Sequence, residues 1–220
     1  MNRFAFVQKS LFSKLFLLAV ILSVNLVGVH KLAAQADETQ FELFPNPAVL
    51  DCLRASPNVE PKATATVIRG KLNDTLLLDL SGIKPGLAFD LFTVQNSNQT
   101  ANGDPVVGFK NFGLAWYQSD IEIAKLKSTG KVRIKTILLD QIFGFDPAVG
   151  LNPTNTFHVG FWFNDPNDAA ACVNPANFTP FNGEHHAGPL AMISRPDPQT
   201  NLGPLCTNPD TSKNPAVCNP

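Results

Sequence analysis

Hydrophobic and polar side chains alternate over residues 155–163, where the chain reads Asn-Thr-Phe-His-Val-Gly-Phe-Trp-Phe. A period of two places successive side chains on opposite faces of a β-strand. The residues on one face are Phe157, Val159, Phe161 and Phe163. Such an apolar face predicts a strand in the core of a sheet. The other face carries His158 and Trp162 where a solvated strand would carry Lys, Thr or Ser, so we expect any functional site to lie near this strand.

Shorter stretches of β-strand character, separated by Gly, Pro and Asn, predict the remaining strands. They cover residues 63–69, 75–80, 88–95, 109–119, 120–126, 131–137 and 189–195. Two short helical turns are predicted where an N-cap residue precedes proline, at Asn46 and at Asp165. Residues 37–45 are expected to form a short lead-in. About seven or eight strands without a long amphipathic helix predict an all-β fold, an antiparallel, Greek-key-like β-sandwich, with a flattened barrel as the alternative.

The beginning of the chain has the pattern of a signal peptide. A positively charged segment with Arg3, Lys9 and Lys14 precedes an apolar stretch at residues 15–29, which is short for a membrane span. The sequence Ala-Gln-Ala at residues 34–36 then matches a signal-peptidase site. We expect residues 1–36 to be removed, which leaves a domain at 37–195 and a Pro/Asn-rich tail at 196–220. The protein is expected to be secreted, extracellular or periplasmic, without a transmembrane segment after cleavage; an uncleaved anchor is the alternative.

The charge of the exported part argues against two classes of partner. Residues 1–36 hold four of the 17 basic residues and none of the 18 acidic ones, so 13 basic and 18 acidic residues remain, a net charge of −5. Nucleic acids and anionic membranes are bound by clustered Lys and Arg. We therefore expect neither as a partner.

Four cysteines follow the signal peptide: Cys52, Cys172, Cys206 and Cys218. An even number in an exported chain predicts two disulfides, for which three pairings exist. We favour Cys52–Cys172, because both lie on similar short helical segments, and Cys206–Cys218, because both lie in the tail. The absence of a C-x-x-C pair from the sequence gives no support to structural zinc or to thioredoxin-type chemistry.

The histidines outside the signal peptide are His158, His185 and His186. Together with Glu184 they could supply three or four ligands to Zn or Cu, metals that bind neutral imidazoles and carboxylates. The alternative is that His158 is packed beside Trp162 and that residues 184–186 form an exposed turn. The cofactor expectation is accordingly none, with Zn or Cu as the alternative.

Other chemistries find less support in the sequence. A cupredoxin order of ligands is present as His158, Cys172, His185 and Met192, but the last three are too far apart in sequence, and Cys172 is expected in a disulfide. Copper–zinc superoxide dismutase shares the sandwich architecture, but its paired H-x-H histidines are absent from the sequence. The G-x-S-x-G motif of hydrolases is absent as well, and Asp120 or Glu122 are the conceivable glycosidase acids. We therefore favour a protein without catalytic activity.

Three aromatic residues on predicted strands, Trp116, Tyr117 and Trp162, are candidates for ligand binding. Exposed together they would form a platform on which sugars stack, or an apolar patch for another extracellular protein. The alternative is that they belong to a core that is rich in Phe.

Three strings resemble a group of exported bacterial proteins: FGLAWYQSD at 112–120, NTFHVGFWFNDP at 155–166 and FNGEH at 181–185. The resemblance covers about residues 46–195. It implies secretion and a bacterial source, and it implies no activity. The sequence therefore predicts a secreted, non-catalytic binding or interaction module of unknown ligand, with a metal-binding protein or metalloenzyme as the alternative.

Overall fold

The computed structural model of the protein describes residues 38–70, 73–124, 132–139, 155–174, 188–206, 209–210 and 217–218. All of these belong to the second of two compact units, Ala36–Pro220. In these residues we find no helix with the length and apolar character needed to cross a bilayer.

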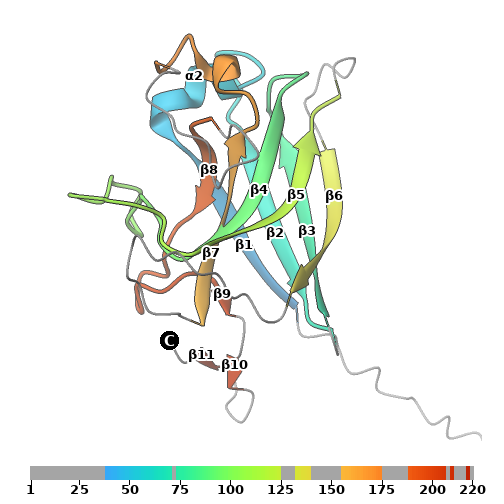
Figure 1. Ribbon diagram of the computed structural model, residues 1–220, viewed down its shortest axis with the longest axis vertical. Helices are drawn as coiled ribbons and strands as arrows, with labels where there is room; N and C mark the ends of the chain where they lie inside the picture. The colour runs from blue at the N-terminus through green and yellow to red at the C-terminus, as the bar shows by residue number, and fades with distance from the viewer. Residues whose placement is uncertain are drawn as a thin grey trace, which may run out of the picture. The chain divides into compact units, whose positions relative to one another are not determined.

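Antiparallel strands dominate this unit (Figure 1). The longer strands are β1 (Glu38–Pro45), β2 (Lys62–Ile68), β3 (Asn73–Ser81), β4 (Ala88–Val94), β5 (Ala115–Glu122), β6 (Val132–Leu139), β7 (Thr156–Phe163) and β8 (Leu190–Ser194). The short ones are β9 (Leu205–Cys206), β10 (Pro209–Asp210) and β11 (Val217–Cys218). The main sheet has the order β5-β4-β7-β8-β1-β2-β3-β6, with β9 paired to β7, and β10 pairs with β11 in a second sheet.

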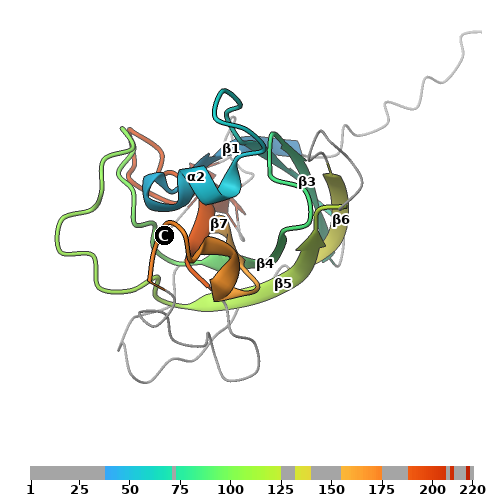
Figure 2. The same ribbon diagram turned by 90° about the horizontal axis from the view of Figure 1, so that it is seen from above.

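The main sheet curls until its two outer strands nearly meet (Figure 2). The Thr136 hydroxyl of β6 lies 3.4 Å from the Gln118 carbonyl oxygen of β5, to which it donates a hydrogen bond. The predicted antiparallel all-β fold is therefore confirmed, but the strands do not form the two separate sheets of a sandwich. The reason lies in β1, which pairs with β2 along most of its length and with β8 at Leu43–Pro45, and so joins the two halves.

Both predicted helical turns are present, and both have the predicted caps. The Asn46 side chain accepts a hydrogen bond from the backbone N–H of Ala48 at 3.2 Å, ahead of η1 (Pro47–Val49) and α2 (Leu50–Leu53). The Asp165 carboxylate accepts one from the N–H of Asn167 at 2.8 Å, ahead of η2 (Pro166–Ala169). Proline follows each cap because the first turn of a helix does not need its N–H.

The predicted Cys52–Cys172 disulfide joins the two helical turns, with a Cα–Cα distance of 6.2 Å. Cys206 is disulfide-bonded as well, which is consistent with the predicted bridge to Cys218. The tail also enters the sheet, since Leu205 and Cys206 of β9 pair with the first two residues of β7. The Arg69 guanidinium donates to the Cys206 carbonyl oxygen and forms an ion pair with Asp74, which fastens this part of the tail to the strands.

The alternation of β7 predicts that its apolar face lies in the core, and the structure buries both of its faces. Its inward side chains belong to the main core, where the Phe89 ring lies 5.0 Å from that of Phe161 and 5.2 Å from that of Phe163. Its outward residue Trp162 belongs to a second cluster with Phe92, Val94, Leu190 and Ile193. Phe112, from the β4–β5 loop (residues 95–114), packs against this second cluster, so part of that loop covers the outer face of the sheet.

Candidate functional site

His158 lies on the outer face of β7, opposite Val94 of β4. It is 3% exposed, so the imidazole is almost completely withdrawn from solvent. Strand β7 has β4 on one side and β8 on the other. The last residue of β8, Ser194, is also fully buried.

Ser194 fixes the proton position on the imidazole. The Nδ1 atom of His158 is 3.0 Å from the Ser194 carbonyl oxygen, and because a carbonyl can only accept, Nδ1 must carry the proton. The Ser194 hydroxyl oxygen lies 3.3 Å from the same Nδ1 and accepts a hydrogen bond from the N–H of Val159 at 3.1 Å. In this tautomer Nε2 has a lone pair and no hydrogen. Within the described part of the chain Nε2 has no hydrogen-bond partner.

The burial of His158 also keeps it neutral. Desolvation lowers the pKa of the imidazole to about 4, although the hydrogen bond to Ser194 acts in the opposite direction. At pH 7 the side chain is therefore an uncharged acceptor, available to an O–H or N–H group or to a metal ion.

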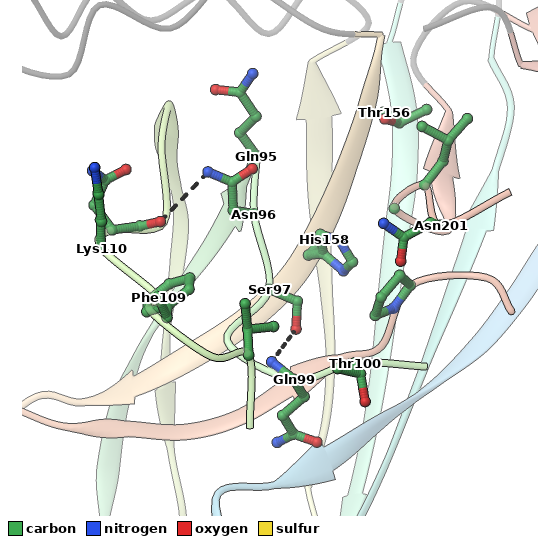
Figure 3. Close-up of a pocket in the computed structure, with 15 residues that line it drawn as sticks. Gln95, Asn96, Ser97, Gln99, Thr100, Phe109, Lys110, Thr156, His158 and Asn201 are labelled. Atoms are coloured by element: carbon green, nitrogen blue, oxygen red, sulfur yellow. Dashed lines mark hydrogen bonds between the residues drawn. The ribbon is translucent and has the colours of Figure 1, made fainter. Parts of the chain in front are cut away.

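A pocket of about 700 Å³ opens over His158, between the β4–β5 loop and the β8–β9 segment (residues 195–204). Figure 3 shows the imidazole in the middle of the residues that line it. Most of its polar side chains are amides, from Gln95, Asn96, Gln99, Asn111 and Asn201. Ser97, Thr100 and Thr156 add hydroxyl groups. The lining that the structure describes contains no carboxylate, and its only charged residue is the exposed Lys110.

The β4–β5 loop is held in place by Arg195. The Arg195 Nε donates to the Gln99 side-chain oxygen at 3.0 Å, and its guanidinium carbon lies 3.8 Å from the centre of the Phe44 ring. Gly103, with φ +92°, lies so close to the guanidinium that a Cβ would overlap it. These contacts fix the wall of the pocket that contains Gln99, which is 3% exposed.

The opposite wall is a turn that presents Asn201. The Asp197 carboxylate accepts hydrogen bonds from the N–H groups of Gln199 and Thr200 at 2.9 and 2.8 Å, and these bonds lower the pKa of that carboxyl. Asn201 follows with φ +57°, the left-handed conformation that Asn tolerates better than most residues. Its N–H donates to the Asp197 carbonyl oxygen at 2.8 Å. The turn thus places Asn201 at the pocket, and Figure 3 shows it to one side of His158.

The predicted metal ligands are divided between described and undescribed parts of the chain. His158 is placed as above, whereas Glu184, His185 and His186 lie outside the described residues. Among the residues that are described, no group of three or more His, Cys, Asp or Glu side chains is arranged to hold a metal ion. Cys172 is in a disulfide, as expected, and so has no thiolate to offer copper.

The predicted aromatic platform is not present among its three described residues. Trp162 is 3% exposed, and its ring makes T-shaped contacts with Phe92 at 5.5 Å and with Phe112 at 5.0 Å. Tyr117 is 43% exposed, while Trp116, the residue before it on β5, is half-buried and points to the opposite face. The β4–β5 loop covers the face on which Trp162 lies, so the three rings share no exposed surface in the described residues. A role of these residues in ligand binding stays a prediction.

The candidate glycosidase acids lie on β5, away from the pocket. Asp120 is exposed and accepts a hydrogen bond from the Tyr117 hydroxyl at 2.8 Å. Burial, and to a smaller extent this hydrogen bond, raises the pKa of Tyr117 to about 12. Glu122 is exposed near the end of the strand. Asp90, which the sequence analysis did not single out, lies opposite Asp120, is fully buried and accepts a hydrogen bond from the Asn164 amide at 2.9 Å.

No protein-family model, curated protein or solved structure matches the chain. The resemblance of its three strings to exported bacterial proteins therefore stays a prediction. Any function has to be argued from the pocket over His158.

Proposed function

We propose that the protein is a secreted bacterial binding domain without catalytic activity, and that its ligand occupies the pocket over His158. One observation carries this proposal: a buried, neutral imidazole whose Nδ1 is bonded to Ser194 and whose Nε2 has no partner among the described residues. Nε2 is not among the fully buried side-chain atoms of the described residues that lack a partner, so its lone pair is accessible from the pocket that His158 lines. A ligand that donates to Nε2 supplies that partner.

The composition of the pocket favours binding over catalysis. General acid–base catalysis works best with groups whose pKa lies near the working pH, and the pKa of His158, at about 4, is well below neutrality. The other ionisable side chain in the described lining is Lys110, which is exposed. Amides and hydroxyls, which bind without exchanging protons, supply most of the polar surface.

The disulfide supports the proposed location. Cys52 and Cys172 are 120 residues apart in sequence, and their disulfide joins two helical turns. Each of these turns begins with a capping residue followed by proline. Bridges of this kind persist in oxidising compartments and are rare in the cytosol. Together with the signal-peptide pattern of residues 1–36, this supports export.

Metal binding is the second candidate. A histidine that binds a metal through one nitrogen usually donates its other N–H to a carbonyl or a carboxylate, which is the arrangement of His158 and Ser194. Glu184, His185 and His186 are the ligands that the sequence offers in addition. The metal itself would then be Zn or Cu.

A ligand screen on protein produced from the full chain tests both candidates. Saturation-transfer NMR measures binding of neutral oligosaccharides, sugar acids, dipeptides and nucleosides, and calorimetry measures Zn²⁺ and Cu²⁺ separately. Two variants report on the pocket: His158→Phe keeps a ring but removes both nitrogens, and Thr100→Trp fills the space from the loop side. We expect at least one organic class to bind the wild type and to bind each variant at least about tenfold more weakly. Binding of none, or binding that both variants retain, would contradict the proposal.

A further inference from the structure

We infer that the ligand of this pocket is an uncharged saccharide, one of whose hydroxyl groups donates to Nε2 of His158. This inference rests on the proposed function and specifies the class of ligand. It follows from the charge of the pocket, from its hydrogen-bonding groups and from the pairing of the strand beneath it.

The charge of the pocket selects against ions. A buried cation needs a compensating negative charge. The described lining provides none, and Lys110 would repel a cation. An anion would find only this one ammonium group, and because Lys110 is exposed, solvent and salt screen its charge. The neutral state of His158 adds no charge of either sign, so an uncharged ligand fits best.

The hydrogen-bonding groups suit a molecule that both donates and accepts at closely spaced positions. His158 Nε2 can only accept, which requires an O–H or N–H group on the ligand. The Asn201 side chain makes no hydrogen bond to any described residue, so its amide is free to donate and to accept. The Ser97 hydroxyl accepts from the N–H of Gln99 at 3.2 Å and keeps its own hydrogen for the ligand. Sugar hydroxyls meet all three needs, because each can donate and accept at once.

The apolar surface and the volume of the pocket also fit a saccharide. The Phe109 ring, packed 4.9 Å from that of Phe112, and the ring of Pro196 both line the pocket and can cover the C–H faces of a sugar. The volume of about 700 Å³ lies within the roughly 300–1,000 Å³ that is usual for small-ligand pockets. An oligosaccharide of a few units is therefore the size of ligand that we expect.

An extended peptide is the strongest competitor, and the sheet argues against it. Peptides that bind to sheets usually add a strand to a free edge. Below the pocket, β7 has neighbours on both sides: Val94 of β4 pairs with His158, while β8 and β9 occupy the other side. Between β8 and β9, the Ser194 hydroxyl oxygen accepts the hydrogen bond from the N–H of Val159. This part of β7 therefore has no free edge to which a peptide could add as a strand.

Asn201 provides a sharp test, because its conformation permits a nearly neutral substitution. Asn201→Gly removes the amide but accepts φ +57° without strain. Gln199→Ala is the matched control, since Gln199 belongs to the same turn, is exposed and does not line the pocket. Binding of neutral oligosaccharides built from glucose, mannose, galactose and N-acetylglucosamine is measured by saturation-transfer NMR and calorimetry. Oligomers of uronic acids, dipeptides and nucleosides are measured in parallel.

We expect a neutral oligosaccharide to bind about tenfold more weakly to Asn201→Gly and to His158→Phe, which is the loss of one hydrogen bond in each case, and equally well to Gln199→Ala. If uronic acids, dipeptides or nucleosides bind through His158 and neutral sugars do not, the inference is wrong while the proposed function stands. If no class binds in a manner that depends on His158, both are wrong. Neutral sugars that bind all variants equally would place their site elsewhere and overturn the inference as well.

Discussion

The buried imidazole of His158 makes the stability of the fold depend on pH. Its pKa is about 4 in the folded protein, against 6.5 for an ordinary histidine such as that of the unfolded chain. Between these two values the unfolded chain binds the additional proton, so the free energy of unfolding falls as the pH is lowered from 6.5 toward 4. One pKa unit corresponds to about 1.4 kcal/mol, which gives a total loss of about 3 kcal/mol and a loss of about 2 kcal/mol by pH 5.

The measurement compares urea unfolding of the wild type and of His158→Phe at pH 7 and at pH 5, followed by tryptophan fluorescence. The variant leaves the Ser194 carbonyl without its donor, which costs about 1–3 kcal/mol at both pH values. Every other titrating group is common to the two proteins. The quantity to compare is therefore the stability lost between pH 7 and pH 5.

We expect the wild type to lose about 2 kcal/mol more than His158→Phe over this range. Carboxylates and the remaining histidines contribute equally to both proteins and cancel in the difference. An equal loss in wild type and variant would refute the reasoning, because it would mean that His158 titrates in the folded protein as it does in the unfolded chain.

Three further predictions test other parts of the structure. Gly103→Ala should destabilise the fold by about 1–3 kcal/mol in urea unfolding, because φ +92° is unfavourable for Ala and the Cβ would overlap the Arg195 guanidinium; an unchanged midpoint would show that the loop adjusts freely. The double variant Cys52→Ala/Cys172→Ala should lose about 4 kcal/mol, since the bridge closes a loop across 120 residues; a loss below about 1 kcal/mol would contradict the loop-entropy argument. N-terminal sequencing of the exported protein should begin at Asp37, and a chain that retains residues 1–36 would favour the uncleaved anchor.

Elements whose signals are local were predicted well from the sequence. The period of two in β7 gave the correct inward face, because the side-chain pattern of a strand does not depend on its partners. The capped turns at Asn46 and Asp165 follow from the cap residue and the proline after it. Their similarity in turn led to the correct pairing of Cys52 with Cys172.

Elements that depend on distant partners were missed. Strand β1 carries Glu, Thr and Gln at exposed positions and was expected to be a lead-in without regular structure; its pairing with β2 and β8 overrides these weak local preferences. The segment around Phe112 was expected to be a strand, but β5 begins only at Ala115, and the residues before it fold over Trp162. The outward Trp162 was consequently interpreted as a possible surface residue.

The pocket could not be predicted for the same reason. Its walls come from two loops, residues 95–111 and 196–203, which are about a hundred residues apart in sequence. The end of the first loop was predicted to be part of a strand at 109–119, and the second loop was predicted to belong to a Pro/Asn-rich tail. His158 was singled out because a histidine is unusual on the outer face of a core strand. The tautomer of that histidine depends on Ser194, which no spacing in the sequence connects with it.

The most direct test of the pocket over His158 is NMR of the protein with ¹⁵N-labelled histidine, in which the signals of His158 are identified by their loss in His158→Phe. At pH 7 we expect Nδ1 to carry the proton and Nε2 to be unprotonated, and we expect the Nε2 signal to shift when a bound neutral oligosaccharide donates to it. A protonated Nε2, or an Nε2 signal that does not move when the ligand binds, would contradict the account.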